Sequence, residues 1–128
     1  MSTSSGLLRE LPRVQQVAGE PRRRWFHADA MDLVLWQAED GAIVGFQLAY
    51  DKHRDEHSLS WHRERGFRHW VVDDGEVPSH AKETPLLYAD GAFDRDRVLP
   101  AFVAAAADLP PEIAGFVADR LREFDGRG

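Results

Sequence analysis

The sequence predicts an α+β fold, in which an antiparallel β-meander of about four to six strands is packed on one face by two C-terminal amphipathic helices. Three observations predict it. Short apolar runs, separated by turns that contain glycine, fill the first two thirds of the chain. After residue 94 the apolar residues recur with the 3.6-residue period of a helix. The 128 residues, 43% of them hydrophobic, suit one domain with its own core.

The boundaries of this domain follow from the same patterns. We expect a single domain over residues 1–128, with residues 1–10 flexible, a β-meander over 14–90 and a helical hairpin over 94–125. The stretch Leu7–Val17 fits either a helix or an extended segment. Pro12 interrupts its helical spacing, and proline removes a helical hydrogen bond, so we favour the extended form.

The first strand candidate is the aromatic run Arg24–His27. Its first residue also ends the basic run Arg22-Arg23-Arg24. We interpret this run as a solvated strand or turn, because three charges are too few for a nucleic-acid-binding surface.

The strongest turn signal is Asp40-Gly41, which lies between apolar runs at residues 32–38 and 42–50. Asp-Gly favours a two-residue hairpin loop, and such a loop pairs Glu39 with Ala42. Opposite residues share a face of the sheet, so this register predicts one apolar face, which meets the core, and one mixed face. The apolar face comprises Leu33, Leu35, Val44, Phe46 and Leu48, and the mixed face Val34, Trp36, Ile43, Gly45 and Gln47.

A second hairpin is expected over residues 57–73, with Arg63-Glu64-Arg65-Gly66 as its turn. Pairing Arg63 with Gly66 places Leu59 and Trp61 on one face with Arg68, Trp70 and Val72, and Ser60 and His62 on the other with Phe67, His69 and Val71. Residues 77–84 are expected to form a loop, and residues 85–88 a short edge strand.

Two helices are expected at the C-terminus. Asp94 or Asp96 can cap the first, with Pro100 within or just past its first turn. Pro111 suits the first position of the second helix, which Gly126 can close.

Several function classes are disfavoured by composition. The chain has no cysteine, which excludes a disulfide framework, a thiolate metal site and a cysteine nucleophile, and fits a cytoplasmic location. It has no phosphate-binding or dinucleotide motif, so we expect no cofactor. The net charge of −6 disfavours nucleic acid. We expect no secretory signal and no membrane span.

Two constellations could carry chemistry. The first is an acidic and aromatic pocket in which Asp29 and Asp32 combine with Tyr50 between Trp25 and Trp36, because carboxylates in a shared apolar pocket have their pKa values pushed apart. The alternative is that both aspartates serve local turns. The second is a metal site at His62 and His69, but none of the six histidines has typical ligand spacing, so we interpret them as surface or rim residues and expect no metal site.

The mixed sheet face is the leading candidate for function. Aromatic surface rimmed by polar residues is typical of an interface, and isologous pairing would cover such a face in a homodimer. We therefore predict a non-enzymatic binding or interaction module that homodimerises through this face, with a small enzyme or metabolite-binding protein as the alternative. The candidate residues are Trp25, Asp29, Asp32, Trp36, Gln47, Tyr50, Trp61, His62, His69 and Trp70.

One further pattern is the series Trp25-Phe26, Asp32-Leu33-x-x-Trp36 and Asp40-Gly41-x-Ile43-x-x-Phe46-Gln47-Leu48-x-Tyr50-Asp51. In these runs, and through Val72–Glu76, the chain resembles a family of small bacterial proteins that carries no assigned activity. The resemblance implies a bacterial, cytoplasmic origin and no particular chemistry.

Overall fold

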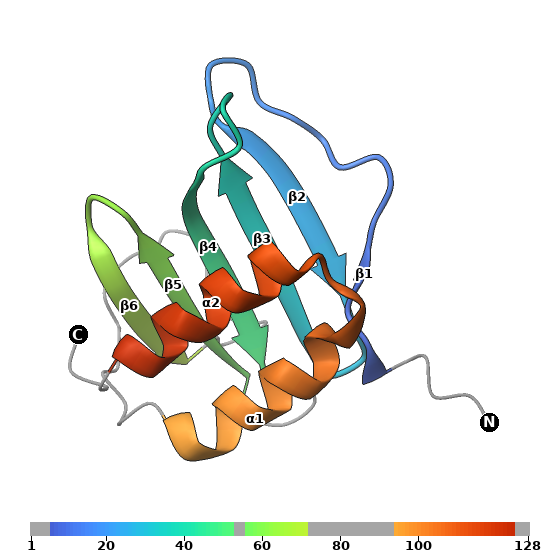
Figure 1. The fold of residues 1–128 in the computed structure, drawn as a ribbon, viewed down its shortest axis with the longest axis vertical. Coiled ribbons are helices and arrows are strands. Elements are labelled where there is room, and N and C mark those ends of the chain that lie inside the picture. The colour runs from blue at the N-terminus through green and yellow to red at the C-terminus, as the bar shows by residue number, and fades with distance from the viewer. Residues whose placement is uncertain (1–5, 53–55, 72–93, 125–128) are drawn as a thin grey trace.

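The computed structural model describes residues 6–52, 56–71 and 94–124 of the chain. The described residues form a six-stranded antiparallel sheet whose strands follow one another in chain order, with two helices after it (Figure 1). The α+β meander predicted from the sequence is therefore confirmed. The elements are β1 (Arg9–Glu10), β2 (Arg22–His27), β3 (Met31–Gln37), β4 (Ile43–Tyr50), β5 (His57–His62), β6 (Gly66–Val71), α1 (Arg95–Ala105), a 3₁₀ turn (Ala106–Asp108) and α2 (Pro111–Glu123).

The first hairpin has the predicted register but a different loop. Leu33 lies opposite Leu48, and Leu35 lies opposite Phe46, as expected. The loop has three residues, because the Gly41 N–H donates to the Ala38 carbonyl and the Ala38 N–H to the Ala42 carbonyl. Gly41 adopts a φ of 92°, as a glycine at the end of a three-residue loop does.

A β-bulge restores the register after this longer loop. The pairing shifts between Trp36 and Gln37, so that Gln37 lies opposite Ile43 and Trp36 opposite Gly45. One extra residue on β4 exchanges the faces locally. Ile43, which we expected on the mixed face, instead packs against the core.

The second hairpin departs from the predicted register by one residue. His62, not Arg63, lies opposite Gly66, so Trp61 lies opposite Phe67 and Leu59 opposite His69. The Arg65 N–H donates to the His62 carbonyl and closes a loop that is one residue longer than the predicted one. No bulge restores the register over the described strands, and the side chains of Phe67, Arg68 and His69 are therefore on the opposite face from the one predicted.

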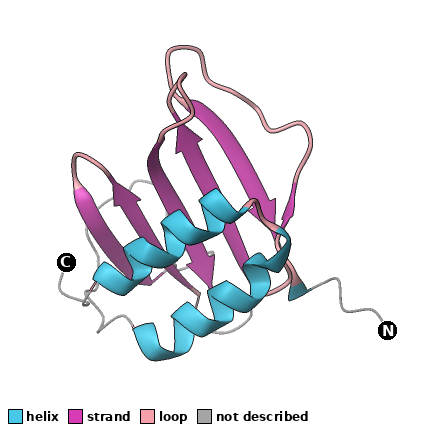
Figure 2. Ribbon diagram, viewed as in Figure 1, coloured by secondary structure: helices cyan, strands magenta, loops and turns pink. Residues whose placement is uncertain are grey.

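The core lies between one sheet face and the helices (Figure 2). Both helices lie on the same side of the sheet, and their apolar stripes meet its apolar face. The most deeply buried side chains of the two layers are Phe26, Leu33, Leu35, Phe46, Leu48 and Leu59 from the sheet and Val98, Phe102, Ile113, Val117 and Leu121 from the helices.

The segment before β1 also belongs to this core. Leu8 is fully buried, and its N–H donates to the Ala105 carbonyl over 2.8 Å. β1 then pairs with the end of β2. The sheet thus begins inside the segment 1–10, which we expected to be flexible.

The helix ends agree in part with the prediction. Asp94 is the N-cap of α1, although its side chain makes no capping bond, and Pro100 lies in the second turn. Pro111 begins α2, as predicted, and the helix ends at Glu123. The expected edge strand at 85–88 and the expected closing residue Gly126 lie outside the described residues.

Arginines fix the start of α1 to the rest of the fold. Arg97 donates to both carboxylate oxygens of Asp51, just after β4, over 3.0 and 2.8 Å. This hydrogen bonding raises the pKa of Arg97. Arg95 donates to the carbonyls of Arg122 and Phe124 at the end of α2. The two helices and the sheet are therefore joined at one end.

Candidate functional site

The sheet face opposite the helices holds half of the candidate residues. We call it the outer face; in the described part of the chain it consists of alternate side chains from β2 to β6. One row across it runs Trp25, Val34, Gln47, Ser60 and Arg68. The neighbouring rows add Arg23, Trp36 and His62 on one side, and His27 and Asp32 on the other.

Asp32 is the centre of a polar cluster on this face. Its side chain is 17% exposed, and Oδ1 accepts from Lys52 Nζ over 3.0 Å and lies 2.7 Å from His27 Nδ1. The indole Nε1 of Trp25 donates to Oδ2 over 3.3 Å. The carboxylate thus holds one indole, one imidazole and one ammonium group in place. The second ring nitrogen of His27, Nε2, is not part of its hydrogen bond to Asp32.

An open pocket lies beside Trp25. It has a volume of about 370 Å³ and is lined by Leu11, Pro12, Arg13, Val14, Gln15, Arg23 and Trp25. The loop that forms its far wall is held to the edge of β2, because the Gln16 amide donates to the Arg23 carbonyl and accepts from the Arg23 N–H, both over 2.8 Å. The Leu11 N–H donates to the Trp25 carbonyl. The pocket is therefore built on the sheet rather than on a loose loop.

The pocket combines apolar walls with positive charge. Leu11, Val14 and the Trp25 indole supply the walls, and Arg13 and Arg23 supply the charges. None of the described residues that line it is acidic. Nε of Arg23 is buried without a hydrogen-bond partner in the described structure. Positive charge beside apolar walls is complementary to an anion that has an apolar body.

Sequence reasoning missed both arginines. Of the basic run, Arg24 lies on the core side and pairs with Glu10, whereas Arg23 lies on the outer face beside Trp36. Strand alternation could have shown this, because residues 23, 25 and 27 fall on the same face of a strand. Residues 11–15, which form the other wall of the pocket, could not be found in this way, because loops have no periodic sequence pattern.

The predicted acidic pocket of Asp29, Asp32 and Tyr50 is not assembled. Asp32 lies on the outer face, and Tyr50 is 3% exposed on the core side. Asp29 lies in the β2–β3 turn, where it lines a different hollow with Met31 and residues of α1. Within the proposed group, Asp32 and Trp25 are joined by a hydrogen bond. Neighbouring residues along a strand point to opposite faces of the sheet, and this separates Asp32 from Tyr50 even though their strands pair.

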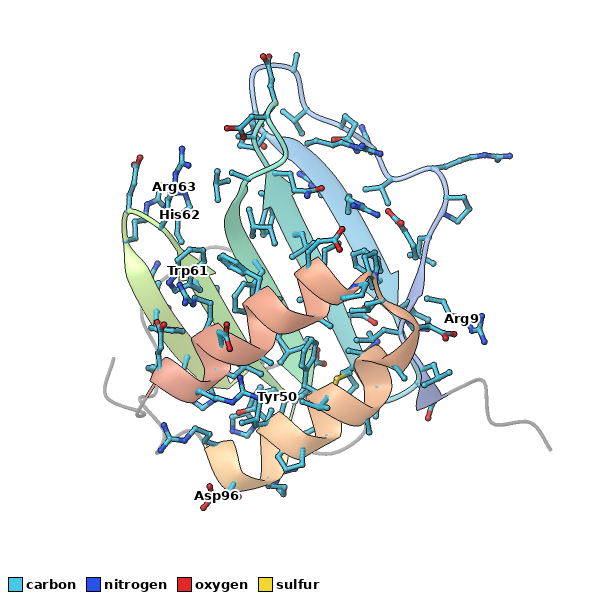
Figure 3. The ribbon with its side chains drawn as sticks, in the orientation of Figure 1. Arg9, Tyr50, Trp61, His62, Arg63 and Asp96 are labelled. Atoms are coloured by element: carbon cyan, nitrogen blue, oxygen red, sulfur yellow. The ribbon has the colours of Figure 1, made fainter. Side chains whose placement is uncertain are left out.

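Tyr50 instead belongs to an aromatic cluster beneath the helices (Figure 3). Its hydroxyl lies 2.6 Å from His69 Nε2, and its ring stacks on those of His57 and His69. Trp61 lies on the same sheet face, against Phe46 and Phe116. These contacts stabilise the core side of β4–β6.

The expectation that His62 and His69 share a sheet face is wrong, because the register shift in the second hairpin puts them on opposite faces. His62 packs over Gly45, and its Nδ1 accepts from the Glu64 N–H. Among the residues with described positions, no three His, Cys, Asp or Glu side chains form a group that could hold a metal ion. The Cα of Trp70 lies opposite that of Ser58, and its side chain is not among those described.

Comparisons with known proteins provide no family for this chain: no family model matches it, and neither does any curated protein or solved structure. Within the described residues, no helix is both long and apolar enough to span a membrane.

Proposed function

We propose that this protein is a binding module that takes a small organic anion with an aromatic or branched apolar body into the pocket between residues 11–15 and β2. The observation that carries the proposal is the joint placement of Arg13, Arg23 and the Trp25 indole around one volume of about 370 Å³. Ligand pockets commonly have such a size, an apolar lining and a few polar groups that fix orientation.

The charge of the pocket supports an anionic ligand. The chain as a whole carries −6, yet the charged residues that line the pocket are two arginines. A guanidinium presents a planar pair of donors that matches a carboxylate or a phosphate. A carboxylate or phosphate on the ligand would bind there, with its apolar body against Trp25.

The orientation of Trp25 is set in advance of binding. Its Nε1 donates to Asp32, which Lys52 and His27 hold from the other side. A preset wall lowers the entropic cost of binding. For a ligand of about ten non-hydrogen atoms we expect a dissociation constant of about 0.1 mM.

Titration followed by ¹⁵N NMR tests the proposal. The indole N–H resonance of Trp25 is assigned by its loss in Trp25→Phe and then followed during addition of phenylacetate, phenyl phosphate and the neutral phenylacetamide. We expect both anions to shift it saturably and the amide to leave it unchanged. Arg23→Gln should weaken binding about tenfold, since a hydrogen bond to a charged group is worth about 1.5–3 kcal/mol.

The matched control is Arg68→Gln, which removes the same charge from β6 at the far side of the same face. Binding should be unchanged in this variant. Equal shifts with phenylacetamide, or equal weakening by both arginine variants, would show that the pocket does not select anions.

A second candidate is the homodimer through the outer face, which the half-buried Trp36 and Val34 favour. Against it, the described charged groups of this face are Arg23, Lys52 and Arg68 with Asp32, and two copies of a net positive face repel each other. Loss of association in Trp36→Ser, measured by sedimentation, would support this candidate.

For both candidates we propose a cytoplasmic location, which a chain without cysteine suits.

A further inference from the structure

We infer that two copies of this chain associate through the solvent-facing side of α1, with the two α1 helices antiparallel about a two-fold axis. The first observation is the composition of that side. From Leu99 to Ala107 the chain has no polar or charged side chain, and Val103 on this run is 50% exposed. The exposed side chains of the run are Pro100, Ala101, Val103, Ala104 and Ala107.

α2 provides an internal comparison. It lies beside α1 on the same sheet face, and it has the usual apolar inner stripe (Figure 2). Its solvent-facing side carries Glu112, Asp119, Arg122 and Glu123. A surface helix normally has such a polar outer face, and a helix that is apolar all round is normally covered. After its charged first turn, α1 has the composition of a covered helix from Leu99 onward.

A second copy is the occupant that the surrounding charges fit. Asp96 and Arg9 lie at opposite ends of α1, where Figure 3 labels them, and Arg9 is 3.9 Å from Asp108 just beyond the helix. Asp96 precedes Val103 by about 10 Å along the axis, at 1.5 Å per residue. Asp108 follows Val103 by about 9 Å, because residues 106–108 form a 3₁₀ turn that rises about 2.0 Å per residue. A two-fold axis near Val103 therefore brings Asp96 of each copy to Arg9 of the other.

The shape of the surface is also self-complementary. Beside Ala101 and Ala104 lies an open hollow of about 480 Å³ that Leu7 and Met31 help to line. The Val103 side chain of one copy can pack at the alanine rim of this hollow on the other, and small residues there allow the helices to approach closely. Stable interfaces bury about 800 Å² per partner, more than one helix face of eleven residues offers. We therefore expect weak dimerisation, with a dissociation constant of about 100 µM.

Sedimentation equilibrium of the full chain between 10 µM and 1 mM tests this inference. We expect the weight-average mass to rise from that of a monomer toward that of a dimer. Val103→Glu should weaken association at least tenfold. Asp96→Arg and Arg9→Glu should each weaken it several-fold, and the double variant should restore it, because the swap re-forms both cross-copy pairs.

The matched control is Asp119→Arg, which makes the same charge change on the outer side of α2 and should leave association unchanged. All four positions are exposed, and far-ultraviolet circular dichroism confirms folding of each variant. A monomer at 1 mM overturns the inference. Association that survives Val103→Glu but is lost in Trp36→Ser also overturns it, because the dimer then forms through the outer face.

Discussion

Gly45 shows how a single residue controls the packing of two strands. A Cβ atom at this position would lie 2.9 Å from the Trp61 carbonyl oxygen and 3.3 Å from the ring of His62. The carbonyl belongs to the backbone of β5 and cannot move without disturbing the pairing of β4 and β5. The missing side chain is what lets His62 lie across β4 beside Trp36.

We therefore predict that Gly45→Ala lowers the free energy of unfolding by about 1–3 kcal/mol, the usual cost of forcing an atom into packed surroundings. Urea denaturation measures the change. Gly115→Ala is the control, because nothing lies within 4 Å of a Cβ at that exposed position of α2. The same substitution should there stabilise the protein by about 0.5–1 kcal/mol, through helix propensity. Equal effects at the two glycines would refute this account.

Asp32 acts on the pocket through Trp25. The carboxylate accepts the indole N–H and fixes the plane of the ring that walls the pocket. Asp32→Asn keeps the shape of the side chain but weakens the bonds from Lys52 and His27. We expect ligand affinity to fall by about three- to tenfold in the NMR titration, while the free energy of unfolding falls by no more than about 1 kcal/mol, because Asn keeps the shape of the side chain and the ion pair is only partly buried. Unchanged affinity would mean that the indole is held by packing alone.

At the scale of elements, the pairing of β1 with β2 depends on an ion pair. Arg24 donates two hydrogen bonds of 2.8 Å to Glu10, and this lowers the pKa of Glu10 below its usual value of 4.5. The folded protein therefore holds its proton on Glu10 less tightly than the unfolded chain does. The pair stabilises the fold above pH 4.5, and this stabilisation is lost as the pH falls through the lower folded value.

Glu10→Gln should thus reduce the free energy of unfolding by about 0.5 kcal/mol at pH 7, because both partners are partly solvated. The difference from the parent protein should shrink as the pH falls below 4.5 and through the lowered pKa of Glu10 in the folded state. Urea denaturation at pH 7, 5 and 3.5 measures this dependence. A difference that stays constant across that range would show that Glu10 acts through packing and not through its charge.

At the scale of the whole molecule, the buried Leu8 joins the start of the described chain to the first of the two C-terminal helices. Its side chain lies in the core, and its backbone bonds to the last turn of α1. Leu8→Ala should lower the free energy of unfolding by about 2–4 kcal/mol, the common cost of a leucine-sized cavity. The exposed Leu11, 39% accessible, provides the control, and Leu11→Ala should change stability by less than about 0.5 kcal/mol.

Local patterns predicted the architecture, whereas contacts between distant segments determined the site. The apolar pairs of the first hairpin and the start of α2 at Pro111 were predictable, because alternation and proline geometry act within a few residues. The second hairpin was not, because one extra residue in its turn puts His69 on the same face as Trp61 instead of on the opposite face. The pocket depends on Gln16 reaching Arg23, seven residues away, and no periodic pattern encodes that contact.

The two hydrogen bonds of Gln16 have a consequence for solubility. A strand at the border of a sheet offers unpaired backbone groups that can recruit another chain and begin a fibril. In β2 the amide of Gln16 occupies the N–H and carbonyl of Arg23, and Leu11 occupies the carbonyl of Trp25. The loop that forms the wall of the pocket therefore also hinders the addition of another β-strand at this edge. Gln16→Ala should shorten the lag time of thioflavin-T-positive aggregation, whereas Gln15→Ala should not.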